Sequence, residues 1–151
     1  MHAVTKTSAA EREALEALAL EFIVSAARLT RVVGKKSGSA YSSNAWRVLS
    51  DLERHGAQRV SDLAQQQNVA QPTMTALMQR LGSEGWVTRE PDPTDGRATL
   101  VTITSRGAQA LADYRTNAAA VLVPHLADLP SDDQVTLLRA AEIMHRIVEV
   151  A

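Results

Sequence analysis

Cysteine is absent from this chain of 151 residues. Its absence excludes disulfide bonds, thiolate metal sites, iron–sulfur clusters and cysteine-based nucleophiles or redox sensors. Aromatic residues make up only 3% of the sequence, so aliphatic side chains must fill most of a core. No uncharged apolar run is long enough to cross a bilayer, and the N-terminal segment lacks the pattern of a signal peptide. We therefore expect a one-domain protein that works in the cytoplasm, away from membranes.

The short motifs of many enzymes are also missing. The sequence contains no glycine-rich phosphate loop, no HExxH and no G-x-S-x-G. His145 and Glu149 stand four residues apart, which is half of a metal site, but a solvated pair explains them more simply. Asp92 and Asp95 resemble the start of a calcium loop, yet the twelfth position is Ile103 where such loops carry glutamate. We expect no enzyme, no metal site and no cofactor.

Charge is unevenly distributed along the chain, although the net charge is only −1. Eleven basic and seven acidic residues lie between Arg28 and Arg106, so the acidic excess belongs to the two flanks. A basic centre fits an anionic partner such as DNA. A chance distribution explains the same pattern, so charge alone does not identify the partner.

Apolar spacing and capping residues predict three helices in the first half of the chain. The first helix begins at a capping box on Ser8 and ends at Gly34. The second follows a serine cap at position 42 or 43 and closes at Gly56. Ser61 caps a short third helix, and Asn68 supplies the left-handed residue that a tight turn to the next helix needs.

A fourth helix is predicted from about Gln71 to Glu84, and it is followed by a β-ribbon. The apolar residues of this helix recur at helical spacing and form one buried stripe, made of Met74, Leu77, Met78 and Leu81. Strands at 86–89 and 99–103 flank a turn rich in proline, aspartate and glycine. Thr104 caps a fifth helix that Pro124 ends or kinks, and a second capping box at 131–134 starts the last helix.

This order of elements predicts a mainly α protein with a small antiparallel β-ribbon. Three short helices before a ribbon are typical of a winged helix-turn-helix. The first and last helices carry apolar stripes that so small a lobe cannot cover, and such stripes are rare on monomers. We expect residues 1–34 to form an N-terminal dimerisation helix, residues 35–106 the winged lobe, and residues 107–151 the C-terminal dimerisation helices.

The outer face of the fourth helix is small and polar, which suits close approach to base edges. It presents Pro72, Ala76, Gln79 and Ser83 directly outward, flanked by Thr73, Thr75 and Arg80. Gln71, Thr73 and Thr75 lie at the N-terminal end, where the helix dipole favours phosphate. In the ribbon, Arg97 can enter a minor groove while Asp95 holds its guanidinium in a bidentate pair. The alternatives are an ordinary solvent-facing helix and a surface ion pair of little energy.

From Ser43 to Gly107 the chain resembles the MarR-type winged-helix transcriptional regulators. The resemblance is carried by Arg47-Val48-Leu49 with Leu52, Val60-Ser61-Asp62-Leu63-Ala64, Val69-Ala70-Gln71-Pro72-Thr73-Met74-Thr75, Arg80-Leu81, Gly85-Trp86-Val87-Thr88-Arg89, Asp92-Pro93-Thr94-Asp95-Gly96-Arg97 and Thr104-Ser105-Arg106-Gly107. The Asp-x-Arg wing followed by Thr-x-x-Gly is its most specific part, and the flanking helices extend it to about the whole chain.

The resemblance implies a triangular homodimer that places recognition helices in successive major grooves and wing arginines in minor grooves. It assigns DNA contact to Gln71, Thr73, Thr75 and Gln79 in the helix and to Asp95 and Arg97 in the wing. The outer face of the helix adds Pro72 and Arg80 to the predicted DNA-contact residues. Many members carry an arginine where this chain has Ala76, so the operator sequence cannot be carried over. The function expected is a ligand-responsive repressor on a palindromic operator; the alternative is a winged-helix protein–protein module that does not bind DNA.

The resemblance also implies a small anionic or phenolic effector between the dimerisation helices and the winged lobe. Four residues are candidates for lining that site: Arg28, Trp46, Arg47 and Tyr114. Such a ligand acts only if it has different affinities for the two arrangements of the recognition helices. Core packing or a surface charge is the alternative role for each of them.

Overall fold

The protein, seen as a computed structural model, is described for residues 8–150. Residues 1–7 and 151 of the predicted dimerisation parts lie outside the described residues. The elements in chain order are α1 (Ala9–Lys36), α2 (Ser43–His55), β1 (Gln58–Arg59), α3 (Val60–Gln66), α4 (Gln71–Ser83), β2 (Val87–Pro91), β3 (Thr99–Ile103), α5 (Ser105–Ala127) and α6 (Ser131–Val150). Among the described helices, none has both the length and the apolarity that a membrane span requires.

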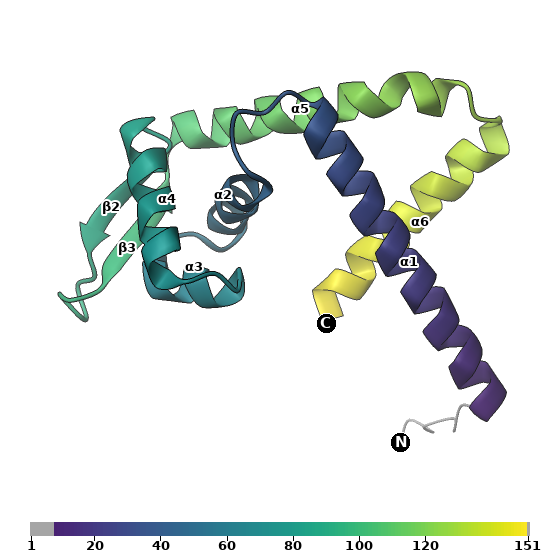
Figure 1. Cartoon of the computed structure of the whole chain (residues 1–151), viewed down its shortest axis with the longest axis horizontal. Coiled ribbons are helices and arrows are strands. Elements are labelled where there is room, and N and C mark those ends of the chain that lie inside the picture. The colour runs from purple at the N-terminus through teal and green to yellow at the C-terminus, as the bar shows by residue number, and fades with distance from the viewer. Residues whose placement is uncertain (1–7, 151) are drawn as a thin grey trace.

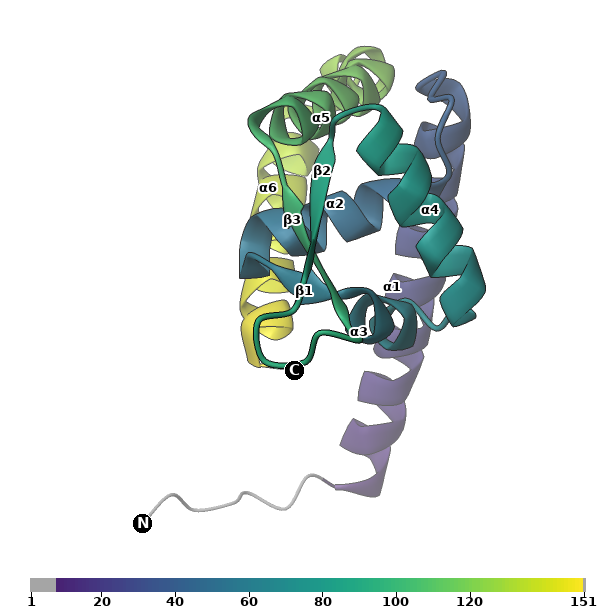
Figure 2. The same ribbon diagram turned by 90° about the vertical axis from the view of Figure 1, so that its left-hand side faces the viewer.

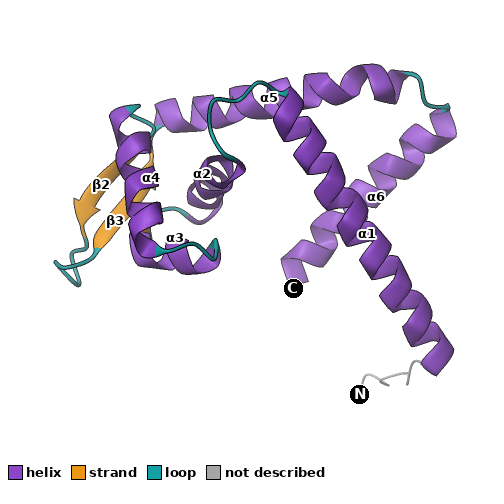
Figure 3. Ribbon diagram, in the orientation of Figure 1, coloured by secondary structure: helices purple, strands orange, loops and turns teal. Residues whose placement is uncertain are grey.

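A winged lobe lies at one end of the molecule and two long helices lie at the other. Helices α2, α3 and α4 and the strands form the lobe, and α5 leads from it to α6, while α1 extends away on the same side as α6 (Figure 1). Colouring by secondary structure shows how small the sheet is beside the helices (Figure 3). The predicted fold class, a mainly α winged helix-turn-helix with flanking helices, is confirmed.

The core of the described residues sits in the lobe, where aliphatic side chains from every helix of the lobe meet. The side chains that are 2% exposed or less include Val48, Leu49, Leu52, Leu63, Met74, Met78, Leu81, Val101 and Leu111. Leu111 brings the start of α5 into this core, so α5 is anchored at its lobe end. Burial of a complete aliphatic side chain stabilises a fold by about 1.5–3 kcal/mol relative to exposure, so this cluster holds the helix-turn-helix together.

The sheet has three strands in the order β1-β3-β2, and both pairings are antiparallel. The predicted ribbon is β2 with β3, in register from Val87 opposite Ile103 to Pro91 opposite Thr99. Strand β1 was not predicted, because two residues are too few to show an alternating pattern. Strand β1 is formed by antiparallel pairing with β3, in which Gln58 lies opposite Val101 and Arg59 lies opposite Leu100. This pairing ties the beginning of α3 to the wing (Figure 2).

Several predicted helix ends are confirmed by the local backbone. Ser8 forms a complete capping box with Glu11, and the Thr104 hydroxyl accepts a hydrogen bond from the Gly107 amide at the start of α5. Asn68 has φ 51° in the turn between α3 and α4, the left-handed conformation that asparagine tolerates. The helix-turn-helix therefore has the predicted tight turn.

Other predicted ends are wrong. Helix α1 continues past Gly34 to Lys36, and α5 continues past Pro124 to Ala127, so Pro124 lies inside α5 and does not end it. Ser61 does not cap α3: pairing of β1 carries the chain directly into the helix at Val60, and Arg59 takes the cap position.

The predicted capping box at residues 131–134 is also absent. The backbone amides of Asp133 and Gln134 both donate to the carbonyl of Pro130, so the helix begins one residue earlier than a serine cap would allow. The Gln134 side-chain amide donates instead to the carbonyls of Leu126 and Leu129. Gln134 therefore closes the α5–α6 turn.

Candidate functional site

Helix α4 has the orientation that the apolar spacing predicts. Met74, Met78 and Leu81 are at most 1% exposed, and Leu77 is half-buried against the same core. On the other side, Gln71, Pro72, Thr73, Gln79 and Arg80 are exposed, and Thr75 is half-buried. The polar face of α4 is therefore free to meet another molecule.

The N-terminal end of α4 and the wing enclose a hollow of about 220 Å³, which we call the wing hollow. It is lined by Val60, Ser61, Gln71, Thr75, Met78, Arg89, Asp95, Arg97, Ala98 and Thr99. The hollow thus brings together four of the predicted DNA-contact residues, two from the helix and two from the wing. Arg89 was not predicted; the two-residue period of β2 could have indicated it, since it shares a strand face with buried Val87.

Arg97 at the tip of the wing is nearly free in solution. Its side chain is 95% exposed and has one contact with Asp95, at 3.5 Å between Nε and Oδ1. The predicted bidentate pair is therefore wrong. The same Asp95 oxygen already accepts a hydrogen bond from the backbone amide of Arg97 at 3.2 Å, which leaves the carboxylate badly placed for two parallel bonds to the guanidinium. A guanidinium held so loosely remains available to a partner.

The base of the wing is held by Asp92, a buried carboxylate that is not among the predicted DNA-contact residues. Its side chain is 6% exposed. One carboxylate oxygen accepts hydrogen bonds from the amide and the hydroxyl of Thr94, both at 2.7 Å. The other oxygen accepts Arg59 Nε at 2.5 Å, and Arg59 Nη2 donates to the Thr94 hydroxyl at 3.1 Å. The bonds from Thr94, reinforced by Arg59, lower the pKa of Asp92 to about 2.

Arg80 stands apart from the wing hollow and lies over an aromatic ring. Its guanidinium carbon is 4.3 Å from the centroid of Tyr41, whose hydroxyl donates to Glu84 Oε1 at 2.7 Å. Burial and the bond to Glu84 raise the pKa of Tyr41. Tyr41 thus contacts two residues from the C-terminal end of α4, and the cation–π contact orients Arg80.

A larger cavity of about 740 Å³, which we call the lobe cavity, lies between α1, α2 and α5. It is lined by Ala27, Thr30, Arg31, Gly34, Lys35, Ser39, Tyr41, Ser43, Trp46, Arg47, Ser50, Leu111, Tyr114 and Arg115. Three of the four predicted effector residues are among them; Arg28 is exposed on α1 and is replaced in the lining by Arg31 and Lys35. Arg31 and Lys35 lie about one and two turns after Arg28 on α1, so the helical period could have indicated both as lining residues.

The wall of the lobe cavity combines stacked aromatic rings with cationic side chains. Trp46 and Tyr114 are stacked with centroids 4.3 Å apart and planes 6° apart, and Tyr41 meets Trp46 edge-on. The lining contains four basic residues and no carboxylate. Arg115 is partly neutralised by Glu53 at 2.7 Å, which leaves Arg31, Lys35 and Arg47 to give the cavity a positive field.

Within residues 8–150, no group of three or more histidine, aspartate or glutamate side chains is placed to hold a metal ion.

Comparison with known proteins gives the family. The model of the MarR family matches residues 41–99. An HTH-type transcriptional regulator of Mycobacterium tuberculosis is 30% identical over 133 residues, 87% of this chain and 93% of that protein. The HTH-type transcriptional repressor IacR of Pseudomonas putida is 36% identical over 64 residues, 42% of this chain and 38% of that one. The crystal structure of apo MarR from E. coli matches with a TM-score of 0.70 at 22% identity, covering 84% of this chain and 95% of that one, which shows the shared fold. The chain belongs to the MarR family, a family of winged-helix transcriptional regulators.

Proposed function

We propose that this regulator is a homodimeric repressor that binds a near-palindromic DNA site, and that a small aromatic anion in the lobe cavity changes its affinity for DNA. The observation that carries the DNA-binding part is the placement of the exposed polar face of α4 beside the exposed Arg97 of the wing. A helix of this kind fits the major groove, and an arginine at a hairpin tip fits the adjacent minor groove.

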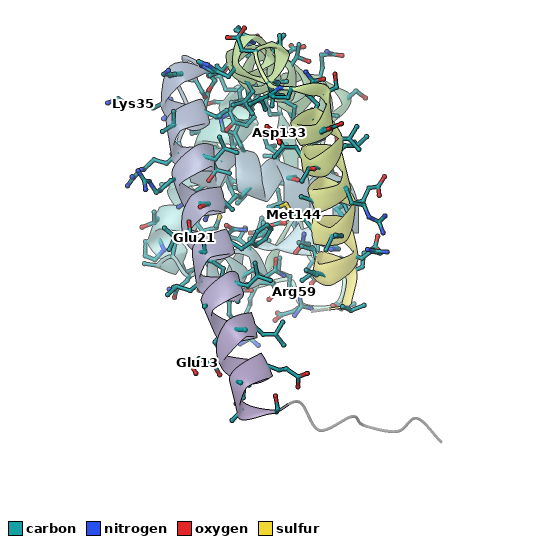
Figure 4. The ribbon with its side chains drawn as sticks, turned by 90° about the vertical axis from the view of Figure 1, so that its right-hand side faces the viewer. Glu13, Glu21, Lys35, Arg59, Asp133 and Met144 are labelled. Carbon is teal, nitrogen blue, oxygen red and sulfur yellow. The ribbon has the colours of Figure 1, made fainter. Side chains whose placement is uncertain are left out.

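The apolar surfaces of α1 and α6 support the homodimer. Helix α6 has no buried residue, and in α1 only Val33 is buried. The exposed apolar side chains on the two helices include Leu15, Leu18, Phe22, Ile23, Leu29, Val135, Leu138, Met144, Ile147 and Val148. In the view of Figure 4, α1 and α6 form two separate columns below α5, so they do not bury one another. A second copy with two-fold symmetry would cover both surfaces.

Repression follows from this arrangement by simple occlusion. A two-fold dimer presents two α4 helices, so its target has two half-sites about 34–36 Å apart, one turn of the double helix. A protein bound across a promoter blocks access to it. The relative in Pseudomonas putida is named a repressor, which supports this direction of control. Such a protein needs no catalytic group and no cofactor, and its target places its action in the cytoplasm.

Salt dependence tests the DNA-binding part directly. The purified protein is titrated into a fluorescently labelled duplex at several salt concentrations, and anisotropy gives the dissociation constant. Because phosphate contacts release counterions, the affinity should fall steeply as salt rises. An affinity that does not change with salt, or no binding at all, would favour a winged-helix module for protein partners.

The lining of the lobe cavity supports the effector class. Stacked rings attract a flat aromatic ligand, and the cations Arg31, Lys35 and Arg47 attract its negative charge. Benzoate is a simple probe because both tryptophans lie in this aromatic cluster, so their fluorescence reports binding. We expect a saturable fluorescence change that weakens in R47M, whereas cyclohexylmethanol, which has neither aromaticity nor charge, should give none.

A further inference from the structure

Asp92 is buried, and the guanidinium of Arg59 is bonded to Asp92 and Thr94. The structure assigns both residues a role in DNA binding: we propose that they are positioning residues that lock the wing against the helix-turn-helix and thereby aim Arg97. This inference rests on the proposed DNA binding. We call the set Arg59, Asp92 and Thr94 the wing latch.

Hydrogen bonds within the wing loop shape its tip, and the wing latch ties the base of that loop to the start of α3. The Asp92 amide donates to the Ala98 carbonyl at 2.9 Å and closes the loop, and the Ala98 amide donates to Asp95 at 2.8 Å. The Asp95 amide also donates to the Asp92 carbonyl, and the Arg97 amide donates to Asp95 Oδ1, both at 3.2 Å, while the Arg97 guanidinium has its 3.5 Å contact with Asp95. The orientation of the tip is therefore set at its base, where Asp92 is buried.

The latch connects two elements that are far apart in the sequence. Arg59 ends β1 and takes the cap position of α3, the first helix of the helix-turn-helix, while Asp92 immediately follows β2. The bridge from Arg59 to Asp92 and Thr94 spans 33 and 35 residues of chain. Because α3 packs on α4, fixing the wing to the start of α3 also fixes the wing relative to the polar face of α4. A pre-set distance between Arg97 and α4 reduces the ordering cost of binding two grooves at once.

A change at Asp92 separates positioning from simple electrostatics. Replacing Asp92 with asparagine removes a negative charge near the expected path of the DNA, and charge alone would make binding tighter. Loss of the latch predicts the opposite, because the amide of asparagine cannot accept all three hydrogen bonds. We expect D92N to bind a selected duplex about tenfold more weakly, a change typical of one lost arginine contact.

A double-mutant cycle shows whether the latch acts through Arg97. In the wild-type background, R97A should weaken binding by about tenfold, and in an R59M or D92N background the same change should cost less than about threefold. R12M serves as the charge control, since it removes one guanidinium from an exposed ion pair at the far end of α1 (Figure 1). In the R12M background, R97A should keep its full tenfold effect.

Folding is checked in the same proteins, and T94V provides a gentler second variant. T94V removes only the hydroxyl that joins Arg59 to Asp92. T94V should raise the hydrogen-exchange rate of the Ala98 amide in the free protein while leaving the circular dichroism spectrum unchanged. In the T94V background, R97A should again weaken DNA binding by less than about threefold. If R97A lowers the DNA affinity equally in every background, or if D92N binds DNA more tightly than the wild type, the proposed latch is overturned while DNA binding remains intact. Failure of the wild-type protein to bind any duplex would instead overturn the proposed function and the latch together.

Discussion

Gln79 and Arg97 serve different purposes in the proposed complex. Gln79 is exposed on the polar face of α4, where a side-chain amide can read a base edge. Arg97 is exposed at the wing tip, where it can contact the DNA backbone and the minor groove. Q79A should change preference at particular base pairs by about 1–3 kcal/mol. R97A should weaken binding to all sequences and lower the salt slope. Binding to a panel of single-base variants measures both, and two mutants that bind like the wild type would show that the contacts are wrongly assigned.

The buried carboxylate of Asp92 makes part of the fold's stability depend on acid pH. Its pKa in the folded protein, about 2, lies below the ordinary value of 3.8. The stabilisation is therefore complete above the unfolded pKa and is lost as pH falls from about 4 towards 2. The difference in Tm between the wild type and D92N should be constant at neutral pH and shrink over this range in thermal melts. A difference that stays constant down to pH 2 would mean that Asp92 is not held as described.

Residues with local signals were predicted, and those that depend on distant partners were not. The period of α4 identified its exposed polar face because helical geometry fixes which residues oppose a buried stripe. Arg59 gave no signal, since its partner Asp92 lies 33 positions away. The bond between Asp92 and Thr94, two residues apart, could have been read as turn chemistry. Arg28 was one helical turn from the residues that line the cavity.

The start of α5 is packed directly on the turn before β2. A Cβ atom added to Gly107 would lie 2.1 Å from the carbonyl oxygen of Trp86, which is backbone and cannot move aside easily. G107A should therefore destabilise the protein by ~1–3 kcal/mol or more, as overpacking does. Urea denaturation measures this, with G96A as the control, because a Cβ at Gly96 meets nothing within 4 Å. Equal stability of the two variants would contradict the packing.

Helices were easier to predict than their ends and far easier than β1. Apolar periods identified the longer helices, and α3 was predicted from a cap and two apolar residues. Each helix end depends on one or two bonds, such as those that Pro130 accepts from the amides that begin α6. Strand β1 has two residues and depends on β3, about forty residues later, so it has no signature of its own.

At the scale of the whole molecule, the exposed apolar helices predict assembly. Leu138 is 65% exposed and lies in an apolar hollow with Val123, Leu126 and Leu137 on α5 and α6. L138E places a charge in the proposed interface, which should shift the protein from dimer to monomer. Size-exclusion chromatography with light scattering measures the mass, and Q109E adds the same charge on the exposed face of α5 as a control. A wild-type protein that is a stable monomer would contradict the proposed assembly.

In the proposed complex, two copies of α4, each flanked by its wing, read one duplex together. Selection of bound fragments from random DNA, followed by sequencing, measures whether they do. We predict enrichment of a near-palindrome whose half-sites are separated by about one helical turn, roughly 34–36 Å. Enrichment of single, unpaired sites, or no enrichment over the starting pool, would contradict it.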